Sequence, residues 1–159
     1  MTTATDDART IPVARAGWMP PRFFLLFGAT GLALHFALGG PTWLRLPGLG
    51  AALVAASVTL VLWGARTFAS VGTTIKPYER TRQLVETGPF RLTRNPMYLG
   101  GVGILAGAAL LTGTPAPWLA TLALALTLHL RFIRNEERAL TASLGTPYES
   151  YCRRVRRWI

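Results

Sequence analysis

The sequence predicts an all-α, polytopic membrane protein with about four transmembrane helices, both termini in the cytoplasm and a C-terminal amphipathic helix at the interface. Three observations predict this fold class. Half of the 159 residues are hydrophobic and only 15% are charged, whereas soluble domains are roughly 25% charged. Long uncharged runs recur along the chain, and nearly all basic residues lie in the segments between alternate runs.

The first two apolar runs are expected to cross the membrane. The polar segment 1–22 suits a cytoplasmic tail, and 23–159 suits a single domain. The run 23–38 follows the tail, and the run 46–65 lies uncharged between two arginines, matching the roughly 20 residues that span a hydrocarbon core. We interpret 23–38 as a span and not as a cleaved signal, because the tail before it is long and further apolar runs follow.

The last uncharged stretch, 95–130, is too long for one crossing and is interrupted by turn-forming residues. Residues 113–117 read G-T-P-A-P, a composition that breaks helices. We therefore expect two short spans, 96–112 and 117–130, joined by a tight hairpin. Residues 131–159 are then expected to form cytoplasmic helices.

The distribution of basic residues predicts the orientation. Of the 17 Lys and Arg residues, only Arg45 falls on the side opposite the N-terminal tail, segment 66–94 and the C-terminal segment. By the positive-inside rule, the richer side is the cytoplasm. The net charge of +10 is attributed to the membrane surface and not to nucleic acid, because the basic residues flank apolar runs.

No metal site is predicted. Cys152 is the only cysteine, and His35 and His129 each lie inside an apolar run without a nearby third ligand. We expect each histidine to hydrogen-bond a neighbouring helix.

Small residues in the spans predict close packing of helices. Gly103 and Gly107 form a G-x-x-x-G pair, which serves packing within a monomer or across a homodimer. The sequence leaves the choice between monomer and homodimer open. Gly100, beside the polar loop, is the glycine best placed to leave room for a ligand.

The C-terminal segment is expected to contain a final amphipathic helix. Gly145 suits a C-cap, Thr146 an N-cap and Pro147 the first helical position. Apolar and aromatic residues then recur at helical spacing among four arginines: Tyr148, Tyr151, Cys152, Val155, Trp158 and Ile159. We favour anchoring to an anionic leaflet over a role as a lid above a site.

The junction at Asn95 and Pro96 suits the binding of a small anion. Asn can cap the free amides of a helix and Pro tolerates its first position, so the positive end of the helix dipole is expected at the membrane surface. Arg94 directly precedes it. Together these groups suit a carboxylate.

Glu136 and Glu137 form a second junction. Neighbouring helical residues point about 100° apart, so the pair is not expected to face one pocket. One carboxylate can bind a ligand while the other pairs with an arginine. Alternatively, both are solvated acids that compensate the arginines around them.

Together these motifs resemble the isoprenylcysteine carboxyl methyltransferase family, whose wider group includes the phospholipid N-methyltransferases. The resemblance covers roughly 73–158. It rests on T-G-P-F-R-L-T-R-N-P-M-Y-L-G from Thr87 to Gly100, the Glu136-Glu137-Arg138 triplet, and L-G-T-P-Y-E-S-Y from Leu144 to Tyr151.

The resemblance implies transfer of a methyl group from S-adenosylmethionine to a lipid or lipid-like acceptor at the cytoplasmic membrane face. The acceptor would be an isoprenylcysteine-type carboxylate or a phospholipid amine. The implied catalytic residues are Arg94, Glu136 and Glu137. The implied cofactor-binding residues are Arg94, Asn95, Pro96, Met97, Tyr98, Leu99, Gly100, Glu136 and Glu137.

Two positions depart from the family pattern. Asn95 stands where the family usually has His, although Asn keeps a donor, an acceptor and the ability to cap. Phe90 stands where Tyr is common. The departure at Asn95 motivates an alternative, a non-catalytic membrane assembly or lipid-binding module. A small transporter is a weaker alternative, because the spans carry no charge at mid-membrane depth.

Overall fold

The computed structural model describes residues 20–70 and 84–159, and every regular element in these ranges is helical. The predicted tail, 1–22, lies outside the described residues except for Pro20 to Arg22, which form the start of the first helix. The elements in chain order are α1 (Pro20–Leu38), α2 (Pro47–Ser70), the 3-10 turn η1 (Gly88–Arg91), α3 (Pro96–Thr112), α4 (Pro115–Thr127), the π-helical segment η2 (Leu128–Ile133), α5 (Arg134–Leu144) and α6 (Thr146–Arg154).

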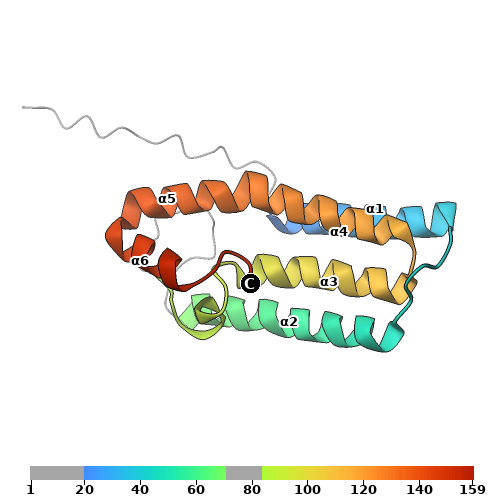
Figure 1. Ribbon diagram of the computed structural model, residues 1–159, viewed down its shortest axis with the longest axis horizontal. Helices are drawn as coiled ribbons and strands as arrows, with labels where there is room; N and C mark the ends of the chain where they lie inside the picture. Colours follow the sequence, from blue (N-terminus) through green and yellow to red (C-terminus); the bar gives the residue numbers. More distant parts are fainter. Residues whose placement is uncertain (1–19, 71–83) are drawn as a thin grey trace, which may run out of the picture.

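Successive long helices run in alternating directions and lie side by side (Figure 1). α1 packs mainly on α4, α4 on α3, and α3 on α2. The order in space is therefore α1, α4, α3, α2. α4 and α3 therefore lie between α1 and α2.

Three helices of the described chain are long and apolar enough to cross a membrane: Pro20–Leu38, Pro47–Ser70 and Pro115–Leu144. α3 is apolar but has only 17 residues, the lower end of the range that spans a bilayer. The all-helical, multi-span prediction is confirmed at this level. The fourth crossing and the position of the termini stay predictions.

The helix of the last predicted span continues past Leu130, as expected from the helical pattern of the charged residues after it. α4, η2 and α5 continue as one helix of 30 residues, because no Gly or Pro follows Pro117 before Gly145 and a change from apolar to charged residues does not break a helix. The helix also begins at Pro115 and not at Pro117, since Pro is tolerated throughout the first turn.

The glycines of α3 serve packing against α2. A Cβ at Gly107 would lie 2.6 Å from Val54 Cγ2 and 2.8 Å from the Gly50 carbonyl, and a Cβ at Gly103 would collide with the Ser57 side chain. The G-x-x-x-G pair is therefore used inside the monomer, where it lets the two backbones approach closely.

The connection between α1 and α2 closes one end of the bundle. Trp43 N donates to the Gly113 carbonyl at 2.9 Å, and Leu46 N donates to the Leu110 carbonyl at 3.0 Å. His35 Nδ1 lies 2.8 Å from Thr114 Oγ1, at the start of α4, so the expected bond to a neighbouring helix is confirmed. This end carries Arg45, whose Nε donates to the Leu111 carbonyl.

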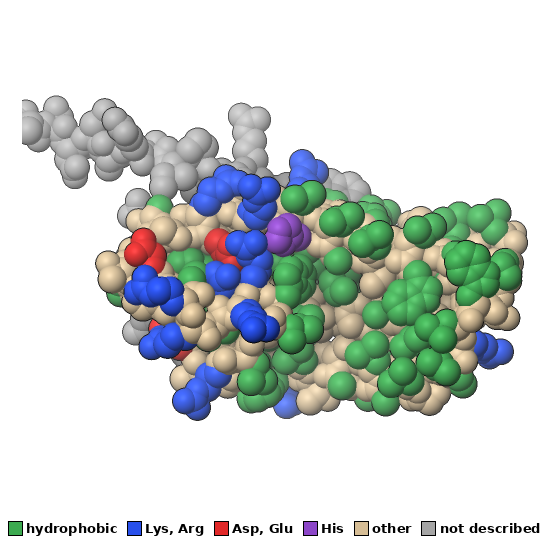
Figure 2. Space-filling model, in the orientation of Figure 1, with side chains coloured by type: hydrophobic (Ala, Val, Ile, Leu, Met, Phe, Trp, Pro, Cys, Tyr) green, Lys and Arg blue, Asp and Glu red, His purple; other side chains and the backbone are tan. Residues whose placement is uncertain are grey.

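Most charged side chains gather at the other end, over α5 and α6, whereas the rest of the face in Figure 2 is mostly hydrophobic. Many large apolar side chains of α1 and α2 are exposed, including Leu25, Phe36 and Trp63. An apolar surface of this extent is expected where lipid covers the protein. The molecule thus has an apolar body and one strongly basic end.

The C-terminal helix is shorter than expected, and its apolar face packs against protein. α6 ends at Arg154, so Val155, Trp158 and Ile159 lie beyond it. Tyr148, Tyr151 and Val155 form a buried cluster, against which Leu84, Leu140, Leu144 and Cys152 pack. These buried side chains pack on protein, so the anchoring role, which stays a prediction, would fall to Ile159, which is 80% exposed, and to the exposed arginines beside it. Thr146 is the first helical residue, and Gly145 with φ of 58° precedes it as the N-cap, so the predicted N-cap is wrong by one residue.

Candidate functional site

Residues 84–95 form a compact turn that delivers Arg94 and Asn95 to the start of α3. Pro89, Phe90 and Thr93 are buried, and Tyr151 Oη donates to the Phe90 carbonyl at 2.7 Å. Burial of the phenol raises the pKa of Tyr151 above its ordinary value. The turn is therefore held from the C-terminal side by α6.

Arg94 is the most constrained charge in this turn. Its side chain is only 13% exposed and its Nη1 lies 3.0 Å from Glu137 Oε1 and 2.7 Å from Cys152 Sγ. Its buried Nε has no hydrogen-bond partner among the described residues. A guanidinium whose Nε lacks a partner is suited to a further anionic oxygen.

Glu137 is held by two arginines. Besides its contact with Arg94, it accepts from Arg157 Nε at 3.0 Å and from Arg157 Nη2 at 2.6 Å. These hydrogen bonds raise the pKa of Arg157 above its ordinary value. The predicted pairing of one glutamate with arginine is therefore seen at Glu137.

Glu136 has a different partner. Tyr98 Oη donates to Glu136 Oε1 at 2.6 Å, which joins α3 to α5. Both glutamates thus reach the segment 94–98 from one helix, Glu137 at Arg94 and Glu136 at Tyr98. Glu137 also lines a hollow on the described surface that Glu136 does not line, in keeping with the expectation that the pair does not face one pocket.

Asn95 does not cap α3 with its side chain. Its Nδ2 donates instead to the Arg157 carbonyl at 2.9 Å, Thr93 Oγ1 donates to the same carbonyl, and Arg94 N donates to the Arg156 carbonyl at 3.0 Å. The C-terminal strap, residues 155–159, therefore lies across the turn. The capping prediction is wrong because the strap offers this amide a carbonyl oxygen.

The other sequence-predicted residues at the start of α3 face α2. The place of a Gly100 Cβ is occupied by the Val61 side chain and the Ser57 carbonyl, and Met97 and Pro96 pack against Gly64. Close packing on α2 therefore accounts for the glycine at position 100.

The structure brings together Arg94, Asn95, Tyr98, Glu136 and Glu137, which we call the junction cluster. Leu99 N donates to the Asn95 carbonyl in the first turn of the helix.

Sequence reasoning missed Arg157, Thr93 and the contact of Arg94 with Cys152. Arg157 belongs to a run of arginines whose pattern predicts contact with lipid headgroups, and nothing in its spacing distinguishes it from the others. His129 lies 3.3 Å from Trp158 Nε1 in the strap, so its polar partner comes from the C-terminus and not from a helix.

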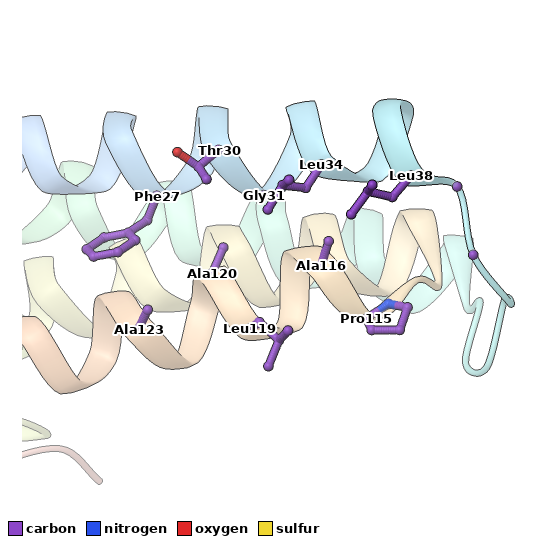
Figure 3. Close-up of a pocket in the computed structure, with 12 residues that line it drawn as sticks. Phe27, Thr30, Gly31, Leu34, Leu38, Pro115, Ala116, Leu119, Ala120 and Ala123 are labelled. Atoms are coloured by element: carbon purple, nitrogen blue, oxygen red, sulfur yellow. The ribbon is translucent and has the colours of Figure 1, made fainter.

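Two of the hollows on the described surface bear on the site. One, of about 450 Å³, is lined by Arg134, Glu137, Arg138, Thr141, Ala142 and Arg157 and adjoins the junction cluster through Glu137. The other, of about 460 Å³, lies between α1 and α4. Figure 3 shows residues that line it on the two helices, with Phe27 and Gly31 of α1 opposite Ala116 and Ala120 of α4. This apolar groove extends to Gly39 and Pro115 and shares no residue with the junction cluster.

Among the described residues, no group of three or more His, Cys, Asp and Glu side chains is arranged to hold a metal ion. The junction cluster instead combines a partly unsatisfied guanidinium, two carboxylates and a phenol. This donor set suits a polar organic ligand with both acidic and hydroxyl groups.

Comparison with protein families gives one match. The model of the family described as PEMT, phospholipid methyltransferase, matches residues 47–146, which is well over half of the chain. The match covers α2 to α5, including the junction cluster. Comparisons with curated proteins and with solved structures find no match. The chain therefore belongs to the phospholipid methyltransferase family, whose members are membrane methyltransferases that use S-adenosylmethionine and act on lipids.

Proposed function

We propose that the junction cluster holds S-adenosylmethionine and that the methyl acceptor is a phospholipid amine or an isoprenylcysteine-type carboxylate. Two contacts carry the proposal. Arg94 Nη1 lies 3.0 Å from Glu137 Oε1, and Tyr98 Oη donates to Glu136 Oε1 at 2.6 Å. These contacts join the motif 87–100 to the motif 136–138, and both motifs predict a cofactor site.

The residues present fit this cofactor. The buried Arg94 Nε lacks a partner among the described residues and is suited to the methionine carboxylate. The first amides of α3 lie beside it, where a helix leaves N–H groups without an intrahelical acceptor. Glu136 and Glu137 are acceptors suited to ribose hydroxyls, and the Tyr98 ring offers an aromatic face to a cation.

When bound, the cofactor supplies an electrophilic methyl carbon on a sulfonium. The chain must then hold the acceptor in line with that carbon and exclude water, since positioning is the main requirement of such a displacement. A carboxylate acceptor needs no general base. An ammonium acceptor must first lose a proton, and Glu136, which lies beside Tyr98, is the group of the cluster that we assign to accept it.

Two features support placing the site at the cytoplasmic face. The junction cluster lies at the end of the bundle where the charged side chains gather (Figure 2), and basic residues are enriched on the cytoplasmic side of membrane proteins. The continuous helix Pro115–Leu144 carries Glu136 and Glu137 beyond its apolar half, as expected for a site at headgroup level.

The test is calorimetric titration of the purified protein with S-adenosylhomocysteine, followed by Glu136→Gln and Arg94→Gln. We expect both substitutions to weaken binding at least tenfold. Glu149→Gln is the matched control, because Glu149 is an exposed acid on α6. Absence of binding to the unsubstituted protein in the millimolar range would refute the assigned site.

The acceptor is tested separately. Turnover is measured with labelled S-adenosylmethionine in bilayers that contain either an aminophospholipid or a prenylcysteine analogue. Methylation of one and not the other assigns the class. One of the two motives for the non-catalytic alternative, a homodimer face at Gly103 and Gly107, is weakened because these glycines pack on α2 within the monomer.

A further inference from the structure

The hollow beside Glu137 is strongly basic. Its lining includes the three arginines Arg134, Arg138 and Arg157, with Thr141 and Ala142 forming the rest of the wall, and its volume is about 450 Å³. We call it the arginine hollow. Glu137 is its only acid among the described residues, and this carboxylate is already shared between Arg94 and Arg157.

Two of these arginines have no anionic partner in the described part of the chain. Arg94, Arg154 and Arg157 form ion pairs with Glu137 or Glu86, whereas Arg134 and Arg138 form none with any described residue. They lie four residues apart on α5, on one helix face, where like charges repel. The arrangement therefore has a positive charge that an external anion can compensate.

Phosphate is the anion that this geometry suits best. Guanidinium groups bind phosphate oxygens through paired N–H donors. The hollow lies on α5, which continues directly from the apolar α4 through η2, so it is placed where the membrane surface begins. A phosphate of a membrane lipid lies at the same level.

The hollow is also next to the groups assigned to methyl transfer. Glu137 is shared by the hollow and the junction cluster, and Glu136 precedes it. In an aminophospholipid the amine is separated from the phosphodiester by a two-carbon link. A phosphodiester bound by Arg134 and Arg138 would therefore bring the amine toward the junction cluster, with which the hollow shares Glu137.

We propose that the arginine hollow binds the phosphodiester of the methyl acceptor and thereby selects an aminophospholipid over a prenylcysteine. The proposal rests on the proposed function of the junction cluster. It assigns to Arg134 and Arg138 a role in binding the lipid and none in binding the cofactor.

The experiment compares two double variants with the same change of charge. In Arg134→Gln/Arg138→Gln the hollow loses two of its cations. In Arg153→Gln/Arg156→Gln two exposed arginines near the C-terminus are removed, and neither lines the hollow. Binding of a short-chain aminophospholipid and of a long-chain amine without phosphate is measured for the unsubstituted protein and both variants in detergent, by native mass spectrometry.

We expect the unsubstituted protein and the control variant to bind the phospholipid at least ~10-fold more tightly than the amine, because the guanidinium groups donate charge-assisted hydrogen bonds to the phosphodiester. The hollow variant should lose this preference while its affinity for S-adenosylhomocysteine stays within twofold. Equal losses in both variants would overturn the proposal, since they would show a general effect of surface charge.

Two further measurements complete the test. One distinguishes a lipid phosphate from a free phosphate, and the other distinguishes failure of the cofactor site from failure of the phosphodiester subsite. Displacement of the lipid by inorganic phosphate at equal concentration would assign the hollow to a free anion and overturn the lipid subsite. If S-adenosylhomocysteine does not bind but the phospholipid preference depends on Arg134 and Arg138, the cofactor site fails and the phosphodiester subsite stands. If cofactor binding is intact and no phospholipid preference is measured, the cofactor site stands and the phosphodiester subsite fails.

Discussion

Tyr98 and Glu136 are joined by a hydrogen bond of 2.6 Å that links the start of α3 to α5. It is a direct side-chain contact between the two sequence motifs that resemble a methyltransferase. Because one partner lies on each motif, the bond also sets the separation of the two walls of the proposed site. Its removal is therefore a sensitive test of the cluster.

Tyr98→Phe should keep the ring and remove only the donor. Leaving the Glu136 carboxylate without this partner is expected to cost about 1–3 kcal/mol of stability and to lower turnover at least tenfold. The measurements are thermal unfolding and methyl transfer in the same bilayer preparation. Unchanged turnover in Tyr98→Phe would show that the bond is structural only.

Glu136 and Glu137 should behave differently when each is changed to Gln. Glu137→Gln leaves Arg94 and Arg157 without their shared carboxylate. Breaking a fully buried pair costs about 3–5 kcal/mol, and this partly buried network should lose less than that but enough to lower the unfolding temperature. Glu136→Gln can still accept a hydrogen bond from Tyr98 and should mainly reduce cofactor binding. Melting curves and calorimetry on both variants check this, and equal mild effects would contradict a site at this helix.

The sequence was sufficient for the helical class, the apolar spans and the pairing of motifs, because these depend on composition and local pattern. The helical pattern of the charged residues after Leu130 also predicts that the last helix extends beyond its apolar half, as the structure has it. The sequence could not reveal the partners of Asn95. Any helix start with Asn-Pro predicts a cap, and only the fold brings the Arg157 carbonyl close enough to compete. The sequence also could not explain Gly100. A glycine there is compatible with room for a ligand and with close packing on α2, and only the structure shows that α2 occupies the space.

Asn95→Ala should loosen the C-terminal strap. The substitution removes the bond to the Arg157 carbonyl and leaves only that of Thr93 Oγ1 at 3.2 Å. We expect trypsin to cleave after Arg156 or Arg157 several-fold faster than in the unsubstituted protein, as followed by mass spectrometry. Asn135→Ala is the control, because the Asn135 side chain bonds to Arg131 within the same continuous helix. Equal cleavage rates would show that the strap is held without Asn95.

The cluster around α6 should make the protein sensitive to alkali. Burial raises the pKa of both Tyr148 and Tyr151 well above the ordinary value near 10. Above that ordinary value the unfolded chain loses these protons while the folded chain keeps them, so the free energy of unfolding falls as pH rises. Below pH ~9 the two residues should contribute no pH dependence. Denaturant unfolding between pH 7 and 11 checks the sign, and Tyr148→Phe and Tyr151→Phe should each flatten the alkaline slope.

Gly107→Val should destabilise the pair of α2 and α3 without changing the oligomeric state. The added side chain would meet Val54 and the Gly50 carbonyl, both closer than 3 Å to the position of its Cβ. Overpacking of this kind typically costs about 1–3 kcal/mol, and the Gly50 carbonyl belongs to the backbone and cannot move aside as a side chain could.

Gly101→Ala is the matched control on the same helix, because its Cβ would lie at an ordinary 3.8 Å from Phe24. Denaturant unfolding in detergent and mass measurement by light scattering separate the two interpretations of the G-x-x-x-G pair. A lower oligomeric mass with unchanged stability would place the pair in a homodimer interface, whereas reduced stability at constant mass follows from the contacts within one chain.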